Sequence, residues 1–132
     1  MRMLLLPALL LSGAVGAFPA SAETGFDHPA RVDVALSSFD FSPSTIRLRA
    51  GQLVTLHLAN TSGGGHNFAA AQFFSAARLA PGMAARIRRG AVEVRGHQSV
   101  DITLVPAAGR YRLRCTHTLH STLGMSGEIV VE

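Results

Sequence analysis

Side chains that bind soft metal ions are concentrated near the C-terminal end of the chain. Cys115, the only cysteine, is followed by His120 and then by Met125, at equal intervals of five residues. Thiolate, imidazole and thioether groups together form the ligand set that copper prefers. The types of these residues therefore predict a copper site.

The equal spacing restricts the backbone between these side chains. A step of five residues turns a side chain well away from its starting face on a helix and inverts it on a strand. The three side chains can therefore meet only if this segment is an irregular loop. Its flanks are typical of strands, because Tyr111, Leu113 and Cys115 alternate with arginines and residues 127–131 resume a strand pattern.

A fourth candidate ligand, His66, follows a strand pattern and three consecutive glycines. Such a glycine run is typical of backbone that passes close to another part of the protein. His66 lies 49 positions before Cys115, so the spacing leaves open whether the two side chains meet. If they meet, two imidazoles and one thiolate with a nearby thioether give the arrangement of blue-copper electron-transfer sites.

The first 22 residues predict an export signal. Arg2 provides a positive start, residues 3–11 form an apolar run, and Ala20-Ser-Ala22 has the form of a cleavage site. A retained membrane anchor is the alternative, which the shortness of the apolar run disfavours. Cleavage would leave residues 23–132 as a single domain in the periplasm, without a stable membrane anchor.

Export changes the interpretation of the lone cysteine. Exported proteins meet an oxidising environment, in which an isolated thiol is a liability unless it is in use. A bound metal would protect the thiolate of Cys115. An intermolecular disulfide or a buried, inert thiol is the alternative.

Short segments of alternating apolar residues, separated by turn signals, recur along the chain. Strands are expected at residues 32–36, 45–49, 53–59, 91–94, 100–105, 110–115 and 127–131. Phe39 and Phe41 are expected on one face before a turn, and the alanine-rich residues 69–90 are expected to form a short helical insertion. This pattern predicts an all-β fold, a Greek-key β-sandwich with one short helical insertion.

All twelve basic residues of the chain are arginine. Six of them could form a basic face toward an acidic partner, or could equally be the solvated sides of strands: Arg86, Arg88, Arg89, Arg110, Arg112 and Arg114. The absence of tryptophan and the single tyrosine offer little for base stacking, so nucleic-acid binding is not expected.

Taken together, these residues resemble the cupredoxins of the plastocyanin/azurin type. The resemblance rests on Asn60 at a strand end, on the segment Gly65-His66-Asn67-Phe68, and on the spacing Cys115-x4-His120-x4-Met125. The C-terminal spacing is most similar to that of rusticyanin and sulfocyanin-like members.

The resemblance implies one type 1 copper ion, with four ligands: His66, Cys115, His120 and, in the axial position, Met125. It also implies that Asn67 and Thr116 join the two ligand loops by hydrogen bonds, since groups behind the ligands fix their geometry. The chain departs from the family pattern at His117, which shares a face with Cys115 if the strand continues and could then replace His120. We favour His120, because only His120 has the family's usual spacing of four residues before Met125.

The leading functional hypothesis is an exported, monomeric electron carrier that is not an enzyme. Its redox partner, a cytochrome, an oxidase or a reductase, would dock near His120 and the apolar Leu119 and Leu123. The alternative is copper tolerance, buffering or delivery, although the chain lacks the Met- or His-rich tails common in such proteins. A structural zinc site or a nucleophilic Cys115 would leave Met125 unexplained.

Overall fold

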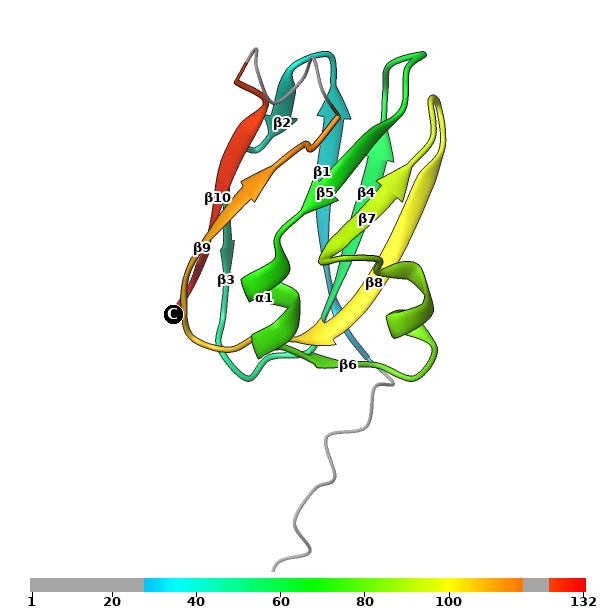
Figure 1. Ribbon diagram of the computed structural model, residues 1–132. Coiled ribbons are helices and arrows are strands. Elements are labelled where there is room, and N and C mark those ends of the chain that lie inside the picture. Colours follow the sequence, from blue (N-terminus) through cyan, green and yellow to red (C-terminus); the bar gives the residue numbers. More distant parts are fainter. Residues whose placement is uncertain (1–27, 118–123) are drawn as a thin grey trace, which may run out of the picture.

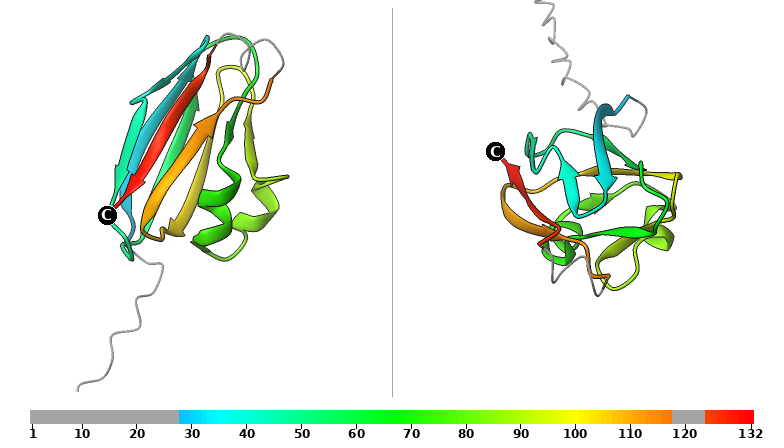
Figure 2. Two further views of the ribbon diagram at one scale, coloured as in Figure 1. Left: turned by 60° about the vertical axis from the view of Figure 1, so that its left-hand side comes forward. Right: turned by 90° about the horizontal axis from the view of Figure 1, so that it is seen from above.

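The computed structural model of the chain describes residues 28–117 and 124–132, which form two sheets packed face to face (Figures 1 and 2). In spatial order, the first sheet contains β2 (Asp40–Ser42), β1 (Ala30–Ser37), β4 (Val54–Asn60), β8 (Ser99–Val105) and β6 (Arg78–Leu79). The second contains β3 (Thr45–Leu48), β10 (Ser126–Val131), β9 (Gly109–Arg114), β5 (His66–Ala69) and β7 (Ala91–Val94). The all-β sandwich predicted from the sequence is confirmed.

Some sequence predictions fall outside the described residues. These are the export signal at residues 1–22 and the candidate docking and ligand residues Leu119, His120 and Leu123. In the described part of the chain, no helix is long and apolar enough to cross a membrane.

Strand β4 illustrates why these segments fold into a sandwich. Val54, Leu56 and Leu58 are buried, while the residues between them are partly exposed. Alternate side chains of a strand point to opposite faces, so this pattern buries one face and solvates the other. Leu56 lies opposite Ile102 of the antiparallel β8, and both side chains are fully buried between the sheets.

An aromatic cluster fills the core beneath the second sheet. Phe68 is fully buried and meets Phe41 edge-on, with ring centroids 6.1 Å apart, and Phe74 at 5.9 Å. Phe73 in turn contacts Tyr111 edge-on at 5.5 Å. Such contacts add to the stabilisation that burial of the rings already provides.

The expectation that Phe39 and Phe41 share one face was wrong. Strands β1 and β2 form a hairpin in which Ser37 pairs with Asp40, so Phe39 lies in the turn with a positive φ of 68°. The turn rotates its side chain outward, where it is 44% exposed, while Phe41 is buried.

The alanine-rich segment forms the predicted helical insertion. It contains α1 (Ala71–Ala76) and the 3-10 helix η1 (Met83–Arg86), and the unpredicted short strand β6 lies between them. Phe73 and Phe74 of α1 are buried and anchor the insertion to the core.

The strand order brings two loops to one end of the sandwich, at the top of Figure 1. Strand β5 begins at His66, β9 ends at Arg114 and β10 begins at Ser126. Because β9 runs antiparallel to both β5 and β10, these three points lie at the same end of the second sheet. The candidate ligands lie at this end.

Candidate metal centre

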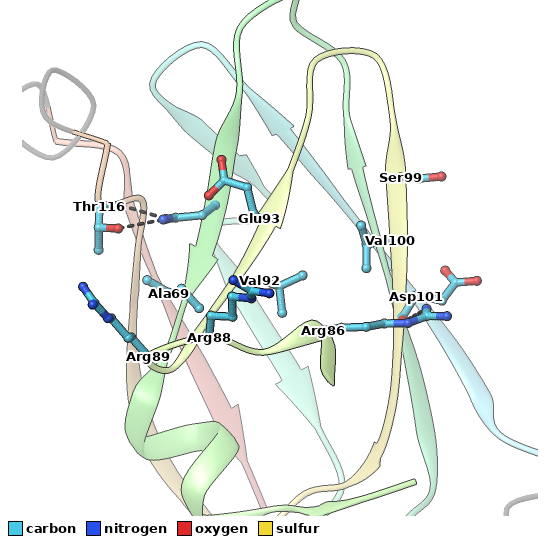
Figure 3. Close-up of a pocket in the computed structure, with 12 residues that line it drawn as sticks. Ala69, Arg86, Arg88, Arg89, Val92, Glu93, Ser99, Val100, Asp101 and Thr116 are labelled. Carbon is cyan, nitrogen blue, oxygen red and sulfur yellow. Dashed lines mark hydrogen bonds between the residues drawn. The ribbon is translucent and has the colours of Figure 1, made fainter. Parts of the chain in front are cut away.

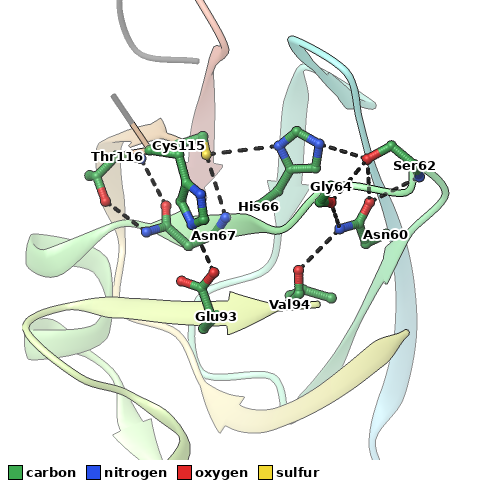
Figure 4. A network of polar contacts seen from close by, with 10 residues as sticks. Asn60, Ser62, Gly64, His66, Asn67, Glu93, Val94, Cys115 and Thr116 are labelled. Atoms are coloured by element: carbon green, nitrogen blue, oxygen red, sulfur yellow. Dashed lines mark hydrogen bonds and ion pairs between the residues drawn. The ribbon is translucent and has the colours of Figure 1, made fainter. Parts of the chain in front are cut away.

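The structure brings His66 and Cys115 together (Figure 4). His66 is the first residue of β5 and Cys115 directly follows β9. Their side chains are 1% and 0% exposed, and Nδ1 of His66 lies 4.0 Å from Sγ of Cys115. The two residues that the sequence could not connect therefore face each other in a buried site.

Met125 lies at the other end of the loop that begins after Cys115. Its carbonyl accepts a hydrogen bond of 3.0 Å from the backbone N–H of Cys115, and its side chain is fully buried. This bond closes the loop, so the two ends of the segment are side by side. The two predicted flanking strands are present, since β9 ends at Arg114 and β10 begins at Ser126, while residues 118–123 of the predicted loop lie outside the described residues.

A hydrogen-bond chain fixes the orientation of the His66 ring. Nε2 of His66 lies 2.8 Å from Oγ of Ser62, which donates its own hydrogen to Oδ1 of Asn60 at 2.8 Å. The amide nitrogen of Asn60 donates to the carbonyls of Gly64 and Val94, which can only accept, so Oδ1 must face Ser62. Ser62 has a single hydroxyl hydrogen, and it therefore accepts from Nε2–H of His66. The unprotonated Nδ1 is left facing Cys115.

Asn67 connects the two segments that carry His66 and Cys115. Its backbone N–H donates to Sγ of Cys115 at 3.4 Å. Its side chain exchanges two hydrogen bonds with Thr116, donating to Oγ1 at 2.6 Å and accepting from the backbone N–H at 2.8 Å. The link between Asn67 and Thr116 that the family resemblance implied is present.

His117 points toward Glu93 rather than toward Cys115. Its Nε2 lies 2.7 Å from Oε1 of Glu93 on β7, and its side chain is 35% exposed. Strand β9 ends at Arg114, so the strand does not continue to His117 as a shared face with Cys115 would require. Within residues 28–117 and 124–132 no group of three His, Cys, Asp or Glu side chains surrounds one point, and His120 lies outside these ranges.

Close backbone contact supports the loop that presents His66. A Cβ atom added to Gly96, in the turn between β7 and β8, would lie 2.1 Å from the carbonyl oxygen of Gly63. Two backbone hydrogen bonds hold the same turn, from His97 N–H to Ser62 O and from Asn60 N–H to Gln98 O. The close approach expected of the glycine run therefore occurs, and it also requires a glycine on the opposite turn.

The chemistry of the donors and their separation fit a shared metal ion. Nitrogen and sulfur ligands each about 2.0–2.3 Å from one ion lie about 3.5–4 Å from each other. The 4.0 Å between Nδ1 and Sγ is close to this range. A buried thiol, an unprotonated imidazole nitrogen that faces it and a buried thioether at the end of the same loop suit copper.

Comparison with known proteins gives the family. Residues 29–132 match the family model described as copper binding proteins, plastocyanin/azurin family. The chain belongs to this family. It is a cupredoxin, its cofactor is copper, and the family works in electron transfer, as the sequence predicted.

Solved structures show the same fold. Auracyanin B is 22% identical, with a TM-score of 0.58 over 80% of this chain and 91% of that one. Auracyanin A, a "blue" copper protein from Chloroflexus aurantiacus, is 23% identical, with a TM-score of 0.55 over 80% of this chain and 100% of that one. McoA multicopper oxidase from Aquifex aeolicus is 15% identical, with a TM-score of 0.62 over 82% of this chain and 30% of that one. A search of curated protein sequences found no significant match.

Sequence reasoning missed Ser62. The signal for it was the Asn60-x-Ser62 spacing directly before the glycines, which is typical of local hydrogen bonds between polar side chains and a turn. The contact of Ser62 with His66 depends on how the loop folds back, which no local pattern indicates.

Proposed function

We propose that this cupredoxin carries single electrons and holds one type 1 copper ion with His66, Cys115, His120 and Met125. One observation carries the proposal: Nδ1 of His66 faces Sγ of Cys115 across 4.0 Å in a buried site. The copper ion would alternate between Cu(I) and Cu(II), and each change would transfer one electron. Met125 would be the weak axial ligand, as its thioether suits that position.

The protein contributes rigidity and the exclusion of water. Hydrogen bonds hold His66 through Ser62 and hold the Cys115 sulfur through the backbone of Asn67. A site held in one geometry needs little rearrangement when the charge of the metal changes, which favours fast electron transfer. Complete burial of Cys115 also protects its thiol from oxidation.

The second imidazole is assigned to His120 rather than His117. The contact between His117 and Glu93 and the end of β9 at Arg114 support this choice. With Cu(II) bound, His117→Ala should leave the visible spectrum nearly unchanged, and His120→Ala should change it strongly. The reverse result would make His117 the ligand.

The proposed partner is a soluble or membrane-bound redox protein that docks near His120, Leu119 and Leu123. The test is to mix the reduced copper protein with candidate cytochromes, oxidases and reductases and to follow its reoxidation. Electron transfer to at least one partner supports the carrier function. Failure with every partner at every ionic strength would contradict it.

We further propose that residues 1–22 direct export to the periplasm and that residues 23–132 form the mature, monomeric domain without enzymatic activity. The family match begins at residue 29, which is consistent with a separate N-terminal segment. The chain covers only 30% of the multicopper oxidase that shares its fold, so the fold match carries no oxidase activity to this domain. Mass spectrometry of the protein from the periplasm should show a chain that begins at Glu23.

A further inference from the structure

Arginine side chains line two adjoining hollows beside Thr116. The larger, of about 960 Å³, lies between β7 and β8 and includes Arg86, Arg88 and Arg89 (Figure 3). The smaller, of about 240 Å³, includes Arg89, Arg112 and Arg114. Ala69, Arg89 and Thr116 border both hollows, so the two hollows form one continuous surface. We call it the arginine groove, defined by five residues: Arg86, Arg88, Arg89, Arg112 and Arg114.

The arginine groove carries an excess of positive charge. Among the ion pairs of the described residues, none involves Arg88, Arg89, Arg112 or Arg114. Two carboxylates, those of Glu93 and Asp101, also line the groove. Both already have partners, since Glu93 lies 2.7 Å from His117 and Asp101 lies 2.5 Å from His57. Arg86 donates to the backbone carbonyl of Asp101.

The groove borders the residues that hold the Cys115 sulfur. Thr116 is covalently joined to Cys115, and Asn67, which also lines the groove, donates its backbone N–H to Sγ. A protein that binds in the groove would therefore contact Thr116, which is covalently joined to Cys115, and Asn67, which is hydrogen-bonded to the Cys115 sulfur. This route to the site does not pass through His120.

We propose that the arginine groove is a second docking surface, which receives an aspartate- and glutamate-rich face of a redox partner protein. The proposal rests on the electron-carrier function proposed above. One electron would pass between the copper protein and the partner, so that one is oxidised as the other is reduced, and no proton moves or covalent bond changes. Guanidinium groups bind carboxylates in bidentate fashion, which suits Arg better than Lys for this task.

The distribution of the arginines favours a protein face over a small anion. They lie along two hollows rather than around a single point, so several carboxylates of one surface can each find a partner. Complementary charge mainly accelerates the encounter of two proteins, which is what short-lived redox complexes need.

The first test measures binding to a fluorescein-labelled peptide of alternating glutamate and aspartate residues. The copper-loaded protein is used at low ionic strength, and the uncharged glutamine–asparagine peptide serves as the reference probe. The double variant Arg89→Gln/Arg112→Gln should weaken binding of the acidic peptide about tenfold. Complementary charge raises the association rate by one to three orders of magnitude, and the variant removes part of that charge. Arg49→Gln, an exposed arginine after β3, is the matched control and should change binding less than about twofold.

Three results would overturn the proposal. Arg49→Gln could weaken binding as much as the double variant does, the uncharged peptide could bind equally well, or inorganic phosphate could displace the peptide at equal concentration. The last result would indicate a small oxyanion site instead. Peptide binding does not require electron transfer, so this test can fail or succeed independently of the carrier function.

A second test measures electron transfer to inorganic oxidants. The double variant should slow oxidation of the reduced protein by hexacyanoferrate(III), an anion, and leave oxidation by the cation tris(phenanthroline)cobalt(III) unchanged or faster. Equal slowing of both reactions would instead indicate damage to the copper site and would contradict a role in docking.

Discussion

At the scale of single residues, Ser62 determines which nitrogen of His66 can bind a metal. Its hydroxyl donates to Asn60 and accepts from Nε2–H of His66, so the lone pair of the imidazole is on Nδ1, which faces Cys115. A histidine ligand needs such a partner on its second nitrogen, which fixes both the tautomer and the direction of the ring. His66, Ser62 and Asn60 therefore act as one unit.

Replacing Ser62 with alanine should weaken copper binding. The variant leaves Nε2–H of His66 without its partner and frees the ring to turn, which typically lowers metal affinity about 10- to 100-fold. Competition with a chelator of known affinity measures the change. Ser75→Ala, at an exposed position of α1, is the control and should leave the affinity unchanged. Equal affinities of the Ser62→Ala variant and the original protein would contradict the role of Ser62.

The sequence revealed the ligand candidates and, through the family resemblance, the link between Asn67 and Thr116, but not the role of Ser62. Cys115 and Met125 stand out because thiol and thioether groups are rare and chemically distinctive. Ser62 does not, because a serine before a glycine run is an ordinary loop residue. Its function arises from a contact over four residues that depends on the fold of the loop.

At the scale of elements, the decisive feature is the separation of β5 and β9 as they approach the site. The two strands pair at Ala69 and Arg114, and continuing that antiparallel register would place Asn67 opposite Thr116. There the side chain of Asn67, not its backbone, accepts the N–H of Thr116, while its own N–H donates to Sγ of Cys115. The side chain bridges the wider gap, and the gap makes room for the Cys115 sulfur.

Asn67→Ala should therefore destabilise the fold and disturb the site. Loss of two hydrogen bonds at a buried position should lower the free energy of unfolding by about 1–3 kcal/mol. Thr116→Val removes only the hydrogen bond to Oγ1 and keeps the one from the backbone N–H of Thr116. It should therefore lower the free energy of unfolding by about half as much. Denaturant unfolding of the metal-free proteins measures both values. A Thr116→Val variant less stable than Asn67→Ala would contradict the bridging role.

The turn between β7 and β8 supports the ligand-bearing loop from outside. Gly96→Ala would place a methyl group against the carbonyl of Gly63, so the two segments must separate. We expect a loss of about 1–3 kcal/mol in the free energy of unfolding, typical of overpacking, and weaker copper binding because Ser62 moves with the loop.

Gly64→Ala is the matched control for this prediction. A Cβ at Gly64 has no atom within 4 Å, although it lies in the same loop. It should change stability by less than about 0.5 kcal/mol. If thermal unfolding shows the two variants to be equally stable, the contact between the turns is not a constraint.

Most of the strands that the sequence predicted have one solvated face. Strands such as β4 and β8 alternate clearly, and their bounds agree with the prediction within two residues. Strand β5 was missed because its first three residues, His66, Asn67 and Phe68, are all buried, so no alternation marks it. Strands β2 and β6 have three and two residues, too few to show any period.

At the scale of the whole molecule, the sandwich joins ligands that are far apart in the chain. His66 begins β5, Cys115 directly follows β9, and Met125 directly precedes the last strand, β10. A metal ion that binds all three can bind only the folded chain. Copper binding and folding are therefore thermodynamically linked.

Copper should accordingly raise the thermal stability of the protein. A ligand at a thousand times its dissociation constant contributes about 4 kcal/mol to the folded state. For a domain of this size that corresponds to a rise in Tm of at least about 10 °C. Differential scanning calorimetry with and without Cu(II) measures the rise, and the Cys115→Ser variant should lose most of it. An equal rise in that variant would place the copper elsewhere.

The visible absorption spectrum of the Cu(II) protein tests the central claim most directly. A bond between copper and the thiolate of Cys115 produces an intense charge-transfer band, which no other residue of this chain can supply because Cys115 is its only cysteine. We predict that the protein shows this band and that Cys115→Ser abolishes it. A Cu(II) protein without the band, or a band that persists in Cys115→Ser, would contradict the assignment of the metal centre.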